Sequence, residues 1–129
     1  MPHDEPLIID FQDALLAPAE YDLASLLTDR VTPRIVTPEL SARLRSYYWR
    51  QRGAAEDANA QRRYVLIALQ RALKVIGRLH YIALAKGKSA PLAFLPDVVA
   101  TTRHFLAQAS LPGLVDAFEA LPWPSPPPP

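Results

Sequence analysis

The chain has no cysteine, which excludes disulfide bonds, thiolate zinc sites and a cysteine nucleophile. It has only four glycines, all isolated, so a glycine-rich phosphate-binding loop is excluded within these residues. No apolar run reaches the roughly 18 residues of a membrane span. The first residues also lack the basic-then-apolar order of a signal peptide. We therefore expect a soluble, cytoplasmic protein with no membrane partner.

The residues that are present indicate one globular domain. The chain has 129 residues, of which 50% are hydrophobic and 21% charged. Residues 1–29 carry seven acids and no Lys or Arg, whereas residues 30–88 carry thirteen Lys or Arg against three acids. This division is compatible with nucleic-acid binding, with mutual neutralisation in the fold, or with a phosphate and metal site. Nucleic acid is the least favoured, because the basic residues are spread over several helices rather than clustered with aromatic residues.

The hydrophobic pattern predicts a mainly α-helical fold with one short strand or hairpin at its start. Residues 7–9 are apolar and read as a buried strand that ends at Asp10. Thr37 followed by Pro38 predicts the start of a helix that Gly53 ends. The 3.6-residue period predicts the other helices. The expected helices are one from residue 20, one from 38, the longest over 56–86, then 95–109 and 112–121, before a Pro-rich tail at 122–129.

The opening stretch IIDFQDALLAPAEYDLASLL resembles the aminoglycoside phosphotransferase family, which has a protein-kinase-like fold. Within that family the resemblance is greatest to the cell-wall-recycling kinases that phosphorylate N-acetylmuramate and N-acetylglucosamine at the anomeric hydroxyl. The later segments LQRALKVIGRL and LPDVV resemble the C-terminal helices of the same group. The resemblance implies that residues 1–121 are the C-terminal helical subdomain of such a phosphotransferase.

The resemblance assigns roles to three aspartates. Asp10 corresponds to the kinase aspartate that holds Mg²⁺ on the nucleotide phosphates; from its position alone, it could instead cap the turn after the strand. Asp22 corresponds to a buried residue that braces the backbone of the catalytic loop, although its place in a helix also suits a first-turn acid. Asp13 either faces the metal or the sugar, or pairs with a basic residue of the middle helices.

Basic and aromatic side chains offer further candidates. Arg71 and Lys74 lie near the acceptor cleft by the resemblance, and their other interpretation is a solvated basic face. The cluster of residues 47–49 (Tyr-Tyr-Trp) is expected to pack in the core, with sugar stacking as the second interpretation. The three histidines have no metal-ligand spacing.

Two departures from the family pattern bear on activity. Ala17 stands before Pro18 where the family has Gly, which adopts backbone angles that Ala resists. More seriously, the 129 residues contain no His-x-Asp pattern with a following Asn, the loop that supplies the base and a second metal ligand. His3 and Asp4 lie too close to Asp10 to form it.

We therefore expect a C-terminal fragment of an amino-sugar kinase that transfers the γ-phosphate of ATP to a sugar hydroxyl. Mg²⁺ and ATP belong to the complete enzyme and are not expected to bind tightly to this chain alone, which we expect to be inactive. A second polypeptide supplying the remaining lobe, or a homo-oligomer, is the expected partner besides the sugar. The alternative is a stand-alone helical protein-interaction module derived from a kinase remnant.

Overall fold

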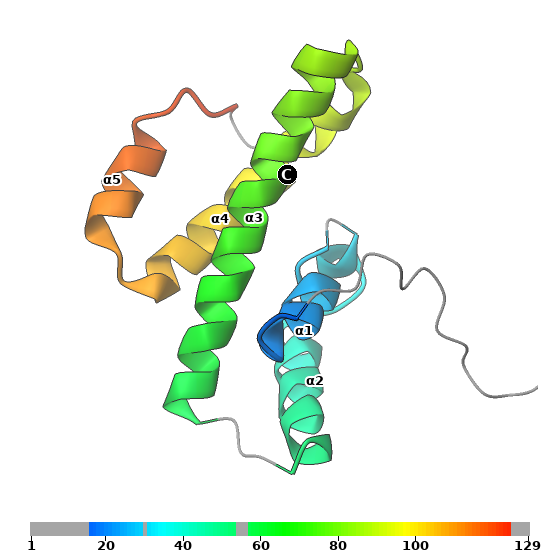
Figure 1. Cartoon of the computed structure of the whole chain (residues 1–129), viewed down its shortest axis with the longest axis vertical. Coiled ribbons are helices and arrows are strands. Elements are labelled where there is room, and N and C mark those ends of the chain that lie inside the picture. Colours follow the sequence, from blue (N-terminus) through cyan, green and yellow to red (C-terminus); the bar gives the residue numbers. More distant parts are fainter. Residues whose placement is uncertain (1–15, 30, 54–56, 125–129) are drawn as a thin grey trace, which may run out of the picture.

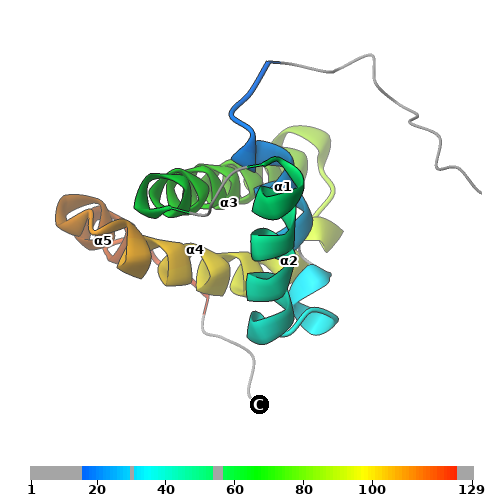
Figure 2. The same ribbon diagram turned by 90° about the horizontal axis from the view of Figure 1, so that it is seen from below.

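The computed structural model describes residues 16–29, 31–53 and 57–124. The longest helix, α3, runs along the long axis of this part of the chain, and α4 crosses it on one side (Figure 1). Helix α5 and the pair α1 and α2 lie on opposite sides of α3 (Figures 1 and 2). The α-helices are α1 (Glu20–Leu27), α2 (Pro38–Gln51), α3 (Ala58–Lys86), α4 (Leu95–Ala109) and α5 (Pro112–Glu119), with short 3-10 turns η1 (Thr32–Arg34) and η2 (Ala90–Phe94).

Side-chain caps fix where two of the helices begin. The Thr37 hydroxyl accepts a hydrogen bond from the Leu40 amide at 3.2 Å, with Pro38 at the first position of α2. The Asp57 carboxylate accepts one from the Ala60 amide at 2.7 Å and starts α3. These bonds satisfy amides that have no partner within their own helix, so the local sequence determines both starts.

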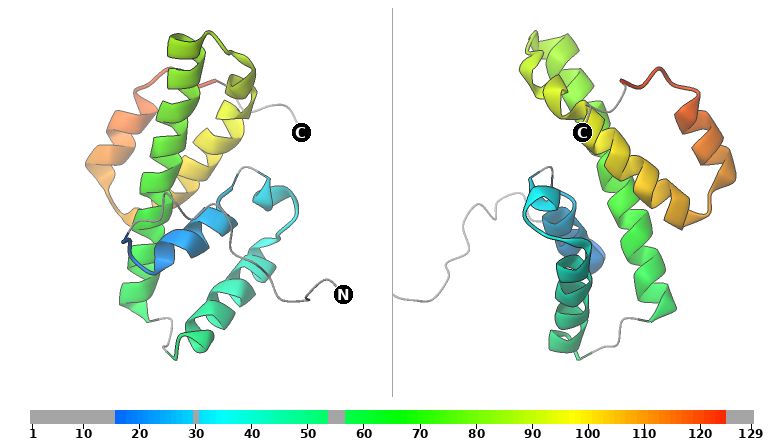
Figure 3. Two further views of the ribbon diagram at one scale, coloured as in Figure 1. Left: turned by 45° about the vertical axis from the view of Figure 1, so that its right-hand side comes forward. Right: turned by 180° about the vertical axis from the view of Figure 1, so that it is seen from behind.

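The ends of α3 and α4 rely on left-handed backbone. Gly87 has φ +63° and terminates α3, and the Lys88 amide donates to the Ile82 carbonyl at 3.3 Å. Ser110, with φ +54°, terminates α4. The chain turns after each helix, so α4 runs back along α3 and α5 turns back again (Figure 3).

The core lies between α1, α3 and α4. Ala24, Ala68 and Val99 are among its most deeply buried members, and their small side chains let the helices approach closely. Tyr64 of α3 meets Phe105 of α4 edge to face, with ring centroids 6.1 Å apart. The buried residues that form this core are Leu23, Ala24, Leu27, Tyr64, Val65, Ala68, Leu69, Ile76, Leu79, Leu95, Val98, Val99, Phe105, Leu106, Ala109 and Phe118.

The predicted fold class is confirmed: the described residues are mainly helical, and each expected helix is present within a few residues. The strand expected at residues 7–10 lies outside the described residues. The expected core role of residues 47–49 is right for Trp49, which is buried, but wrong for Tyr47, which is 55% exposed. The reason is helical geometry, since consecutive residues of α2 point about 100° apart.

The first residues of the expected tail pack onto the last helix. Trp123 stacks on Phe118 with ring centroids 4.5 Å apart, and its indole N–H donates to the Phe118 carbonyl at 2.6 Å. This contact satisfies a carbonyl at the C-terminal end of α5. The packing of the fold therefore includes Trp123, beyond the last helix.

Candidate functional site

A buried carboxylate anchors the start of α1 on α3. The Glu20 side chain is 2% exposed and accepts a hydrogen bond from Arg63 Nε at 2.6 Å. Charged groups are almost never buried without such a partner. Nearby, the Tyr48 hydroxyl donates to the Ala19 carbonyl, so α2 also holds this end of α1. The N-terminal end of α1 is therefore fixed by polar contacts from two helices.

The next residue, Tyr21, meets two cationic side chains of α3. Lys74 Nζ lies 3.3 Å from the Tyr21 hydroxyl, and the Arg71 guanidinium lies over the ring, 5.8 Å from its centroid. The hydrogen bond from Lys74, together with the positive charges of Lys74 and Arg71, lowers the pKa of Tyr21. The structure thus brings together two of the predicted substrate-side residues, around a tyrosine. We call Tyr21, Arg71 and Lys74 the Tyr21 cluster.

Of the three predicted aspartates, only Asp22 lies among the described residues. Asp22 lies in the first turn of α1 with an exposed side chain. The resemblance implied burial, but none of the described elements covers this carboxylate. Its role as a brace of a catalytic loop stays a prediction. Asp10 and Asp13 lie outside the described residues.

The described residues do not by themselves form a metal centre. Over 16–29, 31–53 and 57–124, no three His, Asp or Glu side chains gather as metal ligands. A kinase-type Mg²⁺ would need carboxylate oxygens, which Asp10 and Asp13 could supply. The magnesium role of Asp10 therefore stays a prediction.

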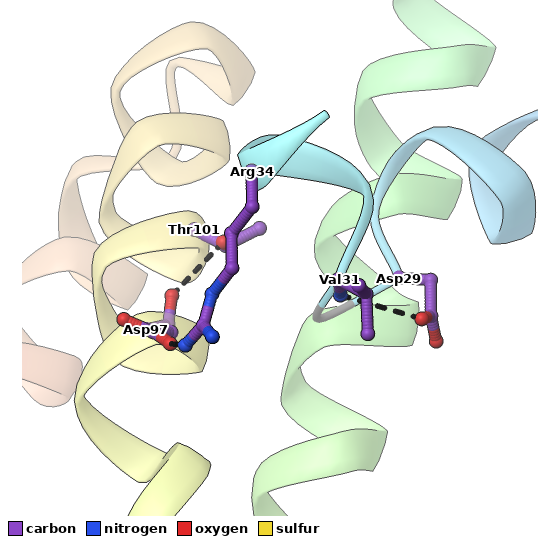
Figure 4. A network of polar contacts seen from close by, with 5 residues as sticks. All are labelled: Asp29, Val31, Arg34, Asp97 and Thr101. Carbon is purple, nitrogen blue, oxygen red and sulfur yellow. Dashed lines mark hydrogen bonds and ion pairs between the residues drawn. The ribbon is translucent and has the colours of Figure 1, made fainter. Parts of the chain in front are cut away.

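A pocket of about 530 Å³ opens at the other end of α1, between that helix, α2, α3 and α4. Its lining mixes apolar side chains with hydroxyl, amide and imidazole groups, including those of Thr101 and His104. Beside it, Arg34 of η1 reaches Asp97 of α4 at 3.1 Å, and the Thr101 hydroxyl donates to the Asp97 carbonyl at 3.0 Å (Figure 4). The pair of Arg34 and Asp97 ties the segment between α1 and α2 to α4.

Glu20 and Tyr21 were not among the residues predicted from the sequence, although a signal for Glu20 was present there. Glu20 precedes Leu23, Ala24 and Leu27 by three, four and seven residues, so it shares their buried face. An acid on the apolar face of a short helix predicts a basic partner from another element. Nothing local distinguishes Arg63 from Arg62 as that partner.

Comparisons with known proteins place the chain in a family. A model of the phosphotransferase enzyme family matches residues 1–65, a range that contains all three predicted aspartates and α1 and α2. No curated protein matches the chain. No solved structure matches it either. In the part of the chain that the structure describes, no helix combines the length and apolar character needed to cross a membrane. The family match covers half of the sequence, and the chain belongs to the phosphotransferase enzyme family.

Proposed function

We propose that this chain forms the acceptor-side helical part of an amino-sugar kinase. In the proposed reaction a sugar hydroxyl attacks the γ-phosphorus of ATP, ADP leaves, and the hydroxyl proton passes to a base. The family match supports phosphoryl transfer, and the resemblance to anomeric sugar kinases supports the choice of acceptor. The domain so defined is residues 1–121.

The observation that carries the proposal is the Tyr21 cluster. Arg71 and Lys74 converge on one point of α1, one residue before Asp22, and neither has a carboxylate partner among the described residues. Two cations held side by side attract a phosphoryl or carboxylate group. We assign the cluster to the acceptor or its phosphorylated product. Mg²⁺ at Asp10 would supply charge neutralisation of the nucleotide phosphates.

Catalysis in this scheme needs groups that the 129 residues do not contain. The base, the second metal ligand and the nucleotide-binding lysine have no match in the sequence. The isolated chain should therefore bind acceptor or product weakly and release no ADP. A cytoplasmic enzyme of cell-wall recycling would obtain these groups from further residues or from a second polypeptide.

The proposal is tested first by turnover. Purified chain is incubated with Mg-ATP and N-acetylmuramate or N-acetylglucosamine, and ADP is followed in a coupled assay. We expect no sugar-dependent ADP. Sustained release that follows the protein through purification would contradict the expected inactivity.

The acceptor role is tested by binding. Titration with N-acetylmuramate or its 1-phosphate, followed by amide chemical shifts, should perturb residues around the Tyr21 cluster. The variants Arg71→Gln and Lys74→Met should weaken binding, whereas Arg62→Gln, on an exposed arginine of the same helix, should not. Shifts confined to the pocket near Thr101 would move the acceptor site there. No saturable shifts with either sugar would contradict the proposed substrate.

A second candidate function, a protein-interaction module, is favoured by exposed apolar side chains. Leu84 is 84% exposed and Ile35 is 72% exposed. Light scattering after size exclusion distinguishes the two: a monodisperse homodimer favours the module, and aggregation favours a fragment that has lost its covering parts.

A further inference from the structure

Helix α2 lies at the edge of the molecule, on the side away from α5 (Figures 1 and 2). Of its fourteen residues only Trp49 is buried. Its inner side holds Tyr48, which packs edge to face on Trp49 with ring centroids 5.4 Å apart and lies under the Arg52 guanidinium. The contacts of α2 with the rest of the fold thus use one side of the helix only.

The opposite side of α2 carries a row of large apolar and basic side chains. Leu40, Arg43, Tyr47 and Arg50 are spaced by three, four and three residues, so they share one face. We call these four residues the outer face. The Leu40 side chain is 37% exposed and the Tyr47 side chain 55% exposed, and all four residues line a shallow groove along the helix. Large apolar and basic side chains thus alternate along this face.

The charge on the outer face is not neutralised within the described residues. The ion pairs found there join Arg34 to Asp97, Arg63 to Glu20 and Arg103 to Glu119. Arg43 and Arg50 have no carboxylate partner in these ranges. The only acid of α2 is Glu39, in its first turn.

We propose that the outer face of α2 is a docking site for an acidic amphipathic helix of a partner polypeptide. Leucine or aromatic side chains of that helix would cover Leu40 and Tyr47, and its carboxylates would bind Arg43 and Arg50. Arginine forms bidentate bonds with carboxylates, and Tyr and Arg are among the residues that most often dominate binding energy at interfaces. This recognition uses the helix-in-groove mode.

The same positive charge disfavours a second copy of this chain as the occupant. A second copy docked through the same face would bring four arginines into one interface with no acid of the outer face between them, and like charges in an interface oppose association. The inference does not depend on the kinase proposal, because no residue of the outer face belongs to the Tyr21 cluster.

The test uses a fluorescein-labelled synthetic helix with leucine along one face and glutamate along the other, and anisotropy as the readout. We expect saturable binding that Arg43→Glu with Arg50→Glu weakens by about tenfold or more, which corresponds to about 1.4 kcal/mol or more. Tyr47→Ala should weaken binding severalfold. The matched control is Arg62→Glu with Arg78→Glu, which makes the same charge change on exposed arginines of α3 and should leave the affinity within about twofold.

Several outcomes would overturn the proposal. Equal losses in the α2 and α3 double variants would show general charge attraction. Equal binding of polyglutamate would show that the apolar residues take no part. Binding to anionic phosphatidylserine vesicles but not to the peptide would reassign the face to a membrane surface. Far-ultraviolet circular dichroism confirms that each variant keeps its helices, and Tyr47→Phe gives a milder probe if Tyr47→Ala does not fold.

Discussion

Glu20 and Arg63 form an ion pair in which one partner is buried and the other half exposed: the Glu20 side chain is 2% exposed and that of Arg63 is 53% exposed. Arg63 can therefore extend its guanidinium from the surface of α3 and cover the carboxylate while keeping contact with water. The pair links α1 to α3 at 2.6 Å, one residue before Tyr21. The position of the Tyr21 cluster thus depends on this contact.

Removal of Arg63 should lower the stability of the protein more than the exposed position of this arginine suggests. Arg63→Met leaves the Glu20 carboxylate buried without its cation, and we expect the free energy of unfolding to fall by about 1–3 kcal/mol. The matched control is Arg62→Met, which removes an exposed arginine at the adjacent position. Urea unfolding measures both. Equal stabilities of the two variants would contradict a structural role for the pair.

The Tyr21 cluster predicts a measurable titration. The hydrogen bond from Lys74, with the charges of Lys74 and Arg71, holds the pKa of Tyr21 below its ordinary value of 10.0. Lys74→Met should raise that pKa, and Arg71→Gln should raise it less, because the bond from Lys74 is the largest cause. Tyrosine labelled with carbon-13 at Cζ gives the titration by NMR, with Tyr21→Phe to assign the signal. Arg78→Gln, two turns further along α3 from Arg71, is the control.

The same shift has a consequence for stability. A group whose pKa is lower in the folded state binds fewer protons there than in the unfolded chain. Between the lowered pKa and pH 10.0 the interaction stabilises the fold increasingly as pH rises, and the contribution is lost as pH falls through the lowered pKa. Lys74→Met should remove this rise in the free energy of unfolding, which urea titrations at alkaline pH measure. A rise that persists in the variant would assign it to another group.

The docking of α5 on α4 should weaken in acid. Arg103 Nε and a terminal guanidinium nitrogen each donate to a Glu119 oxygen at 2.8 Å, and these bonds hold the pKa of Glu119 below its ordinary value of 4.5. The stabilisation is therefore complete above pH 4.5 and is lost as pH falls through the lowered pKa. Amide hydrogen exchange of α5 should become faster in Glu119→Gln at neutral pH. Asp116→Asn, an exposed acid of the same helix, should not change it.

The left-handed ends of α3 and α4 predict opposite effects of two substitutions. Ser110 has φ +54°, a conformation that strains residues with a Cβ, so Ser110→Gly should stabilise the protein by about 0.5–1 kcal/mol. Gly87 has φ +63°, and Gly87→Ser should destabilise it by a similar amount. Thermal unfolding measures both changes. A loss of stability in Ser110→Gly would show that the serine side chain makes a compensating contact.

The sequence alone determined where α2 and α3 begin and where α3 ends, because those decisions are local. Thr37 and Asp57 cap the first turns of α2 and α3, Gly87 provides the left-handed backbone after α3, and the 3.6-residue period marks the buried face of α3. The resemblance to the family is likewise carried by residues close together in the sequence, so the family could be identified before any fold was known.

Only the tertiary structure decided which residues meet. The sequence does not distinguish Arg62 from Arg63. Where α1 crosses α3, only Arg63 bonds to Glu20. Tyr47 and Trp49 are equally aromatic, yet only Trp49 faces the core, because α2 is packed on one side. Partners from distant segments depend on how helices pack, and packing depends on the fit of all the side chains between them, which no local pattern encodes.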